Sequence, residues 1–229
     1  MKTPLDLIGK KVLLFGGSVA LDKGIADVIK EQGATLQIYE EHDVAALEPR
    51  IKELVGNNGP FDGVVFSIVH SDFRPLQFIK PDIVNQIMTD NFSLFIELMR
   101  VLKKCKGMNK GASVVAMSSI SSVRAMKTKT AFCASKAALD AAVRCLAVEL
   151  ADQGIRVNSI QKGGTEADLT KANIQDLLAV RGESADTENR QPLGLSTAEE
   201  VANVVVFLLS DAVKTITGTT IVIDGGYLA

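Results

Sequence analysis

The sequence predicts a single α/β domain, spanning residues 1–229, built on a doubly wound, mainly parallel sheet. Two observations carry this prediction. Short apolar runs rich in β-branched residues alternate along the chain with longer amphipathic stretches, as in repeated βαβ units. Each run is apolar on both faces, which is typical of parallel strands covered by helices on each side. The chain has no internal repeat or low-complexity linker, and its length suits one large domain.

Six apolar runs are the expected strands, and we expect a sheet of six or seven strands. The runs are residues 11–15, 35–39, 63–67, 113–117, 156–160 and 220–223. Helical spacing of apolar residues is clearest in two places, at Ile83, Ile87, Leu94, Leu98 and Val101, and at Leu139, Val143, Leu146 and Leu150. The stretch 170–191 is polar and weakly patterned, so we expect a helical flap or a mobile loop there.

Composition narrows the classes of partner. The formal net charge is −2 and no block of Lys or Arg occurs, so neither nucleic acid nor an anionic membrane is an expected partner. No apolar run is long enough to span a bilayer, and the N-terminal residues lack the apolar core of a signal peptide. Cys105, Cys133 and Cys145 have no metal-ligand spacing. Reduced cysteines and no metal favour a cytoplasmic protein with a small-molecule substrate.

A glycine-rich turn follows the first expected strand. Gly16, Gly17 and Ser18 end that strand, and Gly24 and Ile25 lie at the start of the next helix. Glycines at these positions let backbone amides approach a pyrophosphate at a helix N-terminus. An ordinary turn between a strand and a helix can have the same composition, so this feature alone leaves both interpretations open.

Glu40 follows the second expected strand directly. An acidic residue at that place can accept hydrogen bonds from both ribose hydroxyls of an adenosine, and it would repel a 2′-phosphate. The sequence therefore favours NAD over NADP as cofactor. The alternative interpretation is a solvated surface glutamate.

The middle and the end of the chain carry motifs in a characteristic order. These are SVVAMSS at 113–119, FCASKAAL at 132–139, IRVNSI at 155–160 and ITGTTIVIDGG at 216–226. Their order and spacing resemble the short-chain dehydrogenase/reductase family over essentially the whole chain. The resemblance implies a Rossmann-type fold and an NAD(P)-dependent oxidoreductase. Asn91 falls where the family keeps a structural asparagine.

The resemblance implies a catalytic set of Ser119, Lys136 and Asn91, with Phe132 at the position of the proton-donating tyrosine. It also implies cofactor contacts from Asp43 near the adenine, from Ser67, and from Gly163 and Thr165 near the nicotinamide. Lys136 would bind the nicotinamide ribose as well. Where the family has Pro-Gly, this chain has Lys162 before the glycine, so the nicotinamide contacts are less well specified than those to the adenosine.

Phe132 removes the hydroxyl that the family uses as general acid and base. Such assistance typically contributes ~10²–10⁴ in rate, so ketone reduction should be slow unless another group supplies the proton. His70, whose unperturbed pKa lies near neutrality, is the candidate substitute. Phe132 is compatible with an enzyme that uses another acid, with a natural loss of catalysis, or with an engineered change. Simpler interpretations of the other residues are a turn-forming Ser119, a solvated Lys136 and an exposed His70.

Some segments resemble the enoyl reductase branch of the family. The run FDGVVFSI at 61–68 does so, as does the long loop before Gly24. The spacing of Phe132 and Lys136 is instead of the carbonyl-reductase kind, because enoyl reductases would need a tyrosine at Lys129. Between residues 39 and 63 the chain is shorter than the family norm by roughly a helix and a strand, so a smaller first half is expected.

The leading functional hypothesis is hydride transfer between NAD and a small apolar carbonyl, alcohol or enone. The alternatives are a catalytically silent dinucleotide-binding subunit and a non-redox isomerase or dehydratase on the same scaffold. A homodimer or homotetramer is also expected. The helices over 83–104 and 130–150 carry more apolar positions than one buried stripe requires, and the resemblance implies that they pair about a two-fold axis.

Overall fold

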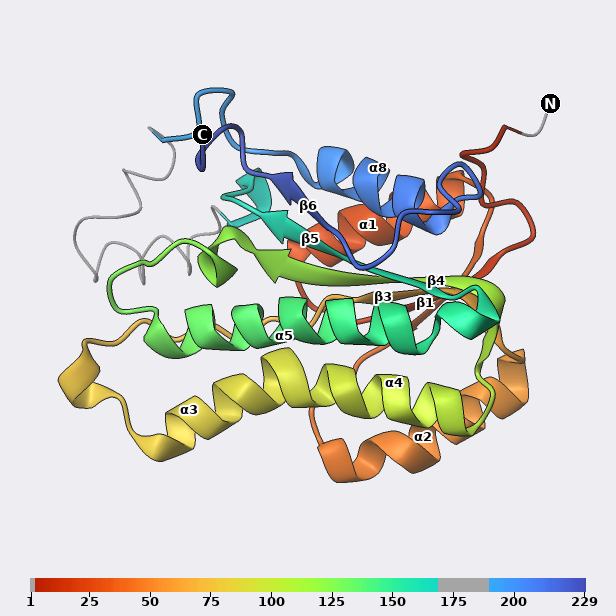
Figure 1. Cartoon of the computed structure of the whole chain (residues 1–229), viewed down its shortest axis with the longest axis horizontal. Coiled ribbons are helices and arrows are strands. Elements are labelled where there is room, and N and C mark those ends of the chain that lie inside the picture. The colour runs from red at the N-terminus through yellow and green to blue at the C-terminus, as the bar shows by residue number, and fades with distance from the viewer. Residues whose placement is uncertain (1–2, 169–189) are drawn as a thin grey trace.

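The computed structural model describes residues 3–168 and 190–229 (Figure 1). In these residues six strands form one wholly parallel sheet, in the order β2-β1-β3-β4-β5-β6. The strands are β1 (Lys11–Phe15), β2 (Thr35–Tyr39), β3 (Phe61–Phe66), β4 (Met108–Ser119), β5 (Arg156–Lys162) and β6 (Thr220–Ile223). The predicted fold class is confirmed. The predicted flap at 170–191 lies outside the described residues, apart from its last two.

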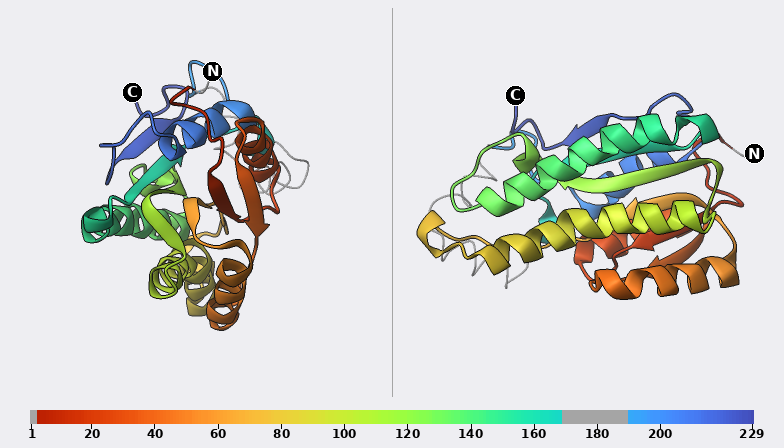
Figure 2. Two further views of the ribbon diagram at one scale, coloured as in Figure 1. Left: turned by 90° about the vertical axis from the view of Figure 1, so that its right-hand side faces the viewer. Right: turned by 60° about the horizontal axis from the view of Figure 1, so that its bottom comes forward.

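Helices cover both faces of the sheet (Figures 1 and 2). On one face lie α1 (Ala20–Glu31) and α8 (Ala198–Leu209), and on the other lie α2 (Val44–Asn58), α3 (Pro81–Met88), α4 (Leu94–Lys104) and α5 (Thr130–Glu149). Successive strand residues point to opposite faces. Val114 therefore packs towards α4 and α5, whereas Val115 packs towards α1 and α8. This packing against helices on both faces explains why the strand segments of the sequence are apolar on both sides.

The first half of the sheet is short, as the sequence predicted. The chain leaves the edge strand β2 at Tyr39 and enters α2 at Val44. Asp43 begins this helix as its N-cap, because its carboxylate accepts a hydrogen bond from Ala45 N at 2.9 Å. The carboxylate thus serves the helix terminus.

The single helix predicted over 83–104 is in fact two helices. A π-helical turn at Thr89–Ser93 separates α3 from α4. Asn91 and Asp90 lie in this turn, and both are buried. Asn91 bonds to the backbone of the loop after β3, and wider turns of this kind often occur at functional sites. Apolar spacing did not reveal the interruption, because Ile87 before the turn and Leu94 after it are both buried.

Candidate active site

Phe132 and Lys136 lie one turn apart on α5, so they share a face of that helix. The Lys136 side chain is buried, and its ammonium group donates a hydrogen bond to Met117 O, near the carboxyl end of β4, at 3.0 Å. Its Nζ lies 5.9 Å from the centroid of the Phe132 ring, which is also buried. Lys136 is therefore not a solvated helix residue. The aromatic position and the lysine are neighbours at the carboxyl end of a central strand.

Burial controls the charge of Lys136. Removal from water and, secondarily, the positive charge of Lys162 lower the pKa of Lys136, Asp140 opposes both effects, and the resulting pKa is about 7. Asp140 lies one turn further along α5, is buried, and accepts a hydrogen bond from Gln161 Nε2 at 2.8 Å. Sequence reasoning missed Asp140, although its spacing of four residues from Lys136 was a usable signal. A lysine with this pKa exchanges its proton near neutral pH.

Ser119 ends β4, two residues beyond the carbonyl that Lys136 contacts. Its Oγ accepts a hydrogen bond from Ser121 N at 3.2 Å and so caps the short 3₁₀ turn at Ile120–Ser122. The turn-forming role weighed from the sequence is therefore present. The hydroxyl proton takes no part in this bond, so it can be donated to another oxygen.

Asn91 connects three segments around the site. Its Oδ1 accepts from His70 N at 2.8 Å, and its Nδ2 donates to His70 O at 2.8 Å and to Ser135 Oγ at 2.9 Å. Ser135 Oγ in turn donates to Phe132 O at 2.8 Å. The amide of Asn91 thus fixes the loop after β3 against the first turn of α5. Asn91 acts here as a positioning residue.

His70 is held by a buried carboxylate. Its Nδ1 lies 2.7 Å from Asp90 Oδ2, and Gln86 Nε2 donates to the other oxygen of Asp90 at 3.0 Å. Such a bond orients the imidazole ring. Asp90 and Gln86 were not expected from the sequence. His70 is more than an exposed loop histidine, and the same loop is joined to α5 through Asn91.

The glycine turn has the backbone that the sequence predicted. Gly16 and Gly17 have φ values of +140° and +136°, which side chains rarely adopt. A Cβ at Gly17 would also lie 2.8 Å from the side chain of Ile38. Ser18 is exposed next to them. The backbone of this turn fits a dinucleotide diphosphate, because Gly17 and Ser18 are exposed at the N-terminus of α1. In this structure Gly17 N donates to the Asp22 carboxylate at 2.8 Å.

Gly24 and Ile25 serve the packing of α1. A Cβ at Gly24 would lie 2.6 Å from the Cβ of Ala198, so the glycine allows α1 and α8 to cross closely. Ile25 is buried in the core between these helices and the sheet. Ser67, just after β3, is buried, and its hydroxyl donates to Asp22, a residue that sequence reasoning did not select.

Glu40 lies beyond the end of β2, where the sequence placed it. Its Oε1 is 3.1 Å from His42 Nε2, and His42 Nδ1 is 3.8 Å from Asp90 Oδ1. One row of ionisable groups therefore runs from the edge strand to the loop after β3, and its members are Glu40, His42, Asp90 and His70. This row was not visible in the sequence because its members come from three separate segments.

The predicted nicotinamide contacts lie beyond β5. Gly163 N donates to Ile223 O at 2.8 Å, and a Cβ at Gly163 would lie 2.8 Å from Gln191 Oε1. Thr165 is fully buried and pairs with Ser196 in an isolated parallel bridge. Both residues belong to the same sheet edge as Lys136.

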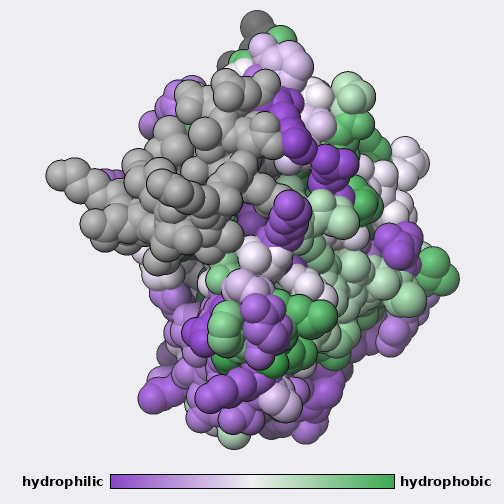
Figure 3. Space-filling model, turned by 90° about the vertical axis from the view of Figure 1, so that its left-hand side faces the viewer, coloured by the Kyte–Doolittle hydropathy of each residue, from purple (hydrophilic) through white to green (hydrophobic). Residues whose placement is uncertain are grey.

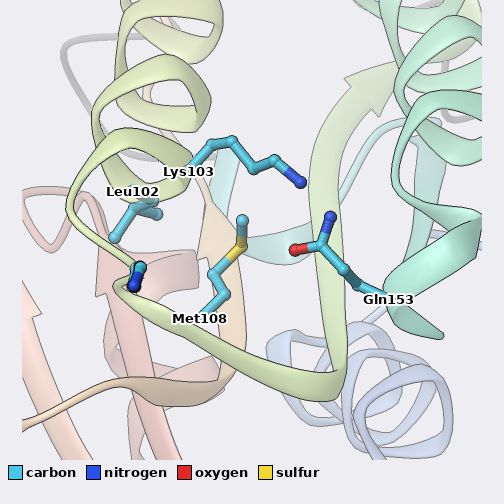
Figure 4. A pocket seen from close by; sticks show the side chains of 5 residues that line it. Leu102, Lys103, Met108 and Gln153 are labelled. Carbon is cyan, nitrogen blue, oxygen red and sulfur yellow. The ribbon is translucent and has the colours of Figure 1, made fainter.

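Other features lie away from this edge. A pocket lined by Leu102, Lys103, Lys106, Met108 and Gln153 lies at the amino end of β4, with Lys103 and Gln153 extending across it (Figure 4). Lys136 contacts the opposite end of the same strand. Within the described ranges no cluster of three metal-ligating side chains occurs. No described helix is long and apolar enough to cross a membrane.

A parallel sheet between two helical layers, with a glycine turn and a buried lysine at its carboxyl edge, defines a nucleotide-dependent oxidoreductase scaffold. A family model described as enoyl-(acyl carrier protein) reductase matches residues 8–228. The chain therefore belongs to the short-chain dehydrogenase/reductase family and is an oxidoreductase of that family, whose members bind NAD(P).

Individual relatives agree with this assignment. D-erythrulose reductase of Gallus gallus is 25% identical over 248 residues, covering 100% of this chain and 99% of that protein. The NADH-type enoyl-acyl-carrier-protein reductase of Neisseria meningitidis is 30% identical, covering 96% of this chain and 95% of that protein. A putative short-chain alcohol dehydrogenase from Sinorhizobium meliloti 1021 has the same fold, with a TM-score of 0.88, 24% identity and 99% of each chain covered.

Proposed function

We propose that this protein transfers hydride between NAD(H) and a small apolar carbonyl, alcohol or enone at the carboxyl end of β4, with turnover limited by Phe132. The observation that carries the proposal is the buried Lys136 ammonium, which lies beside the Phe132 ring and donates to the carbonyl of Met117, two residues before Ser119 on β4. A silent binding subunit would not need this serine and lysine together. The reductase relatives also favour an oxidoreductase over an isomerase.

NAD(H) supplies or accepts the hydride when bound. The residues of this chain then have separate tasks. Ser119 Oγ donates a hydrogen bond to the substrate oxygen, and Lys136 binds the nicotinamide ribose. The phenyl ring of Phe132 fills the tyrosine's space but holds no proton. Each reduction needs one proton, which must therefore come from another group or from water.

His70 is our proposed proton source. Asp90 holds its Nδ1 at 2.7 Å, which leaves Nε2 for an exchangeable proton. Asn91 fixes the backbone of His70 relative to the start of α5, where Phe132 lies. The histidine is partly exposed and can exchange protons with solvent.

An apolar substrate is supported by the loops at the carboxyl edge of the sheet. Large apolar side chains are exposed on the loops that follow β3 and β4 and before α8. They are Val69, Leu76, Phe78, Val123 and Leu193. Figure 3 looks onto this edge, where hydrophobic surface lies among hydrophilic surface. Exposed apolar side chains on the loops next to the site suit contact with an apolar substrate.

The proposal is tested by following NADH oxidation with purified protein and a panel of small apolar ketones and enones. Slow, saturable turnover on at least one of them is expected. Binding of NADH without turnover on any ketone or enone, in the original chain and with tyrosine at position 132, would favour the silent subunit.

NAD(H) should bind at least about tenfold more tightly than NADP(H). The Glu40 carboxylate is held at the end of β2 by His42, where it meets ribose hydroxyls and repels a 2′-phosphate. Hydrogen bonds to charged groups contribute about 1.5–3 kcal/mol. Calorimetric titration of Glu40→Gln should show a smaller difference between the affinities for NAD(H) and NADP(H). The neighbouring variant Glu41→Gln should keep the original difference. A clear preference of the original chain for NADP(H) would contradict the role of Glu40.

We further propose a cytoplasmic homodimer or homotetramer assembled through α4 and α5. The three cysteines, all described, are unpaired, which suits a reducing compartment. One exposed face of α5 is apolar along its length, at Ala137, Ala141, Cys145 and Val148. Val148 is 80% exposed in the single chain.

Light scattering at micromolar concentration should give a dimeric or tetrameric mass. Ala141→Glu should lower the mass to that of a monomer, because it places a charge in the middle of the apolar stripe. Asn57→Glu, on the exposed side of α2, is the matched control and should leave the mass unchanged. A strictly monomeric original chain would refute the assembly.

A further inference from the structure

Asp22 occupies the centre of the glycine turn. It is the third residue of α1, and its side chain turns back towards the start of the helix. Its carboxylate accepts hydrogen bonds from Gly17 N at 2.8 Å and from the hydroxyl of Ser67. It also bonds to the backbone of Val19, the N-cap residue. Only 1% of the residue is exposed.

These donors are the ones that a diphosphate would use. In folds of this type the diphosphate binds amide groups of the glycine turn at the N-terminus of the following helix. The Asp22 carboxylate already bonds to two such amides and places a negative charge among them. A Cβ built on Gly16 would lie 3.2 Å from Asp22 Oδ2, so the carboxylate is in contact with the turn itself.

We propose that Asp22 is an internal competitor for the cofactor diphosphate, so that a dinucleotide binds only when the Asp22 side chain leaves the glycine turn. This inference rests on the proposed NAD(H)-dependent function and adds a regulation of the same site. Binding then requires breaking the bonds from Gly17 N and Ser67 Oγ, and the released donors become available to the diphosphate.

The surroundings of Asp22 support this inference. Burial raises the pKa of the Asp22 carboxyl group, and the negative charge of Glu40, from the end of β2, raises it further, while the bonds from Ser67, Gly17 and Val19 act in the opposite direction. Burial and the charge of Glu40 thus already destabilise the charged form of the Asp22 carboxylate. A diphosphate bound nearby would destabilise this charged form further. Ser67 connects the carboxylate to the loop after β3, the loop that carries His70.

The test compares ligands with and without the diphosphate. Calorimetry would measure NADH, ADP-ribose, ADP and adenosine binding to the original chain, to Asp22→Asn and to Asp27→Asn. The amide in Asp22→Asn keeps the shape but lacks the charge, so the three diphosphate ligands should bind about tenfold more tightly or better, which corresponds to about 1.4 kcal/mol. Adenosine should bind equally to all three proteins. Asp27→Asn removes the same charge from an exposed position on the same helix and should change nothing.

Equal or weaker binding of the diphosphate ligands to a folded Asp22→Asn protein would overturn the inference, and Asp22 would then be only a helix cap. In that case NADH binding to the original chain leaves the proposed function intact. Absence of dinucleotide binding in every variant would overturn both. Circular dichroism reports folding. If Asp22→Asn does not fold, Asp22→Ser, which keeps an acceptor near Gly17 N, replaces it with the same expected results.

Discussion

Phe132→Tyr is expected to raise turnover by ~10²-fold or more on a true carbonyl or enone substrate. The ring already occupies a buried position whose centroid is 5.9 Å from Lys136 Nζ, so the added hydroxyl joins an existing arrangement. The Lys136 ammonium would lower the pKa of the new phenol towards the working pH and so make it an effective acid. Ser119 supplies the second hydroxyl at the end of β4.

Steady-state rates of NADH oxidation for the two proteins measure this effect. NADH affinity should hardly change, because the ribose contact belongs to Lys136. The matched control is Phe73→Tyr, which adds a phenol next to another lysine, since Lys129 Nζ lies 4.7 Å from the Phe73 ring. This variant should leave the rate unchanged.

The opposite result would identify a different acid. If the original chain turns over at ordinary enzyme rates and tyrosine lowers them, the proton does not pass through position 132. His70→Asn would then abolish turnover of the original chain, because it removes the proton that Asp90 helps to position. If neither variant changes the rate, both assignments are wrong.

Lys136→Met is expected to stabilise the protein at neutral pH while weakening NADH binding, because it removes the proposed contact with the nicotinamide ribose. In the folded chain the pKa of Lys136 is about 7, well below its ordinary value of 10.5, because burial penalises the charged form. Methionine has a similar length and no charge to bury. The free energy of unfolding at pH 7 should therefore increase by roughly 2 kcal/mol.

The same shift predicts how stability depends on pH. Because the folded pKa of Lys136 lies below the unfolded one, the unfolded chain binds more protons between these two pH values. The stability of the original chain should therefore rise with pH in that window, by roughly 2 kcal/mol from about pH 7 to about pH 9, through this group. Below pH 7 both states are protonated and the full penalty remains.

Denaturant titrations at several pH values compare the original chain with Lys136→Met. The difference between the two proteins should shrink as the pH rises, since the penalty that methionine removes disappears. Lys110→Met, at an exposed position of β4, is the control and should keep the original pH profile. If the stability of Lys136→Met depended on pH in the same way as that of the original chain, burial would not destabilise the charged form of Lys136 in the folded protein.

The strands, the order of the helices and the neighbouring positions of Phe132 and Lys136 could all be predicted from the amino-acid sequence. Strand runs that are apolar on both faces require helices on both sides, so local pattern and global fold agree. The separation of Phe132 and Lys136 by one helical turn places them on one face in any α-helix. Their side chains are therefore neighbours before any tertiary contact is known. The short stretch between residues 39 and 63 followed from comparing its length with that of the family that the sequence resembles.

The burial of the polar residues and their hydrogen-bond partners could not be predicted in this way, because they depend on how the segments pack in three dimensions. Asp22, Asp90 and Asp140 look like ordinary helix residues in the sequence, yet each is at most 4% exposed. Their partners, Ser67, His70 and Gln161, come from other segments that the sheet brings together. The hydrogen bonds between Asn91, in the π turn, and His70 likewise join segments that are remote in the sequence. Local pattern specifies the elements, whereas the burial and charge of a polar side chain depend on neighbours that are remote in the chain.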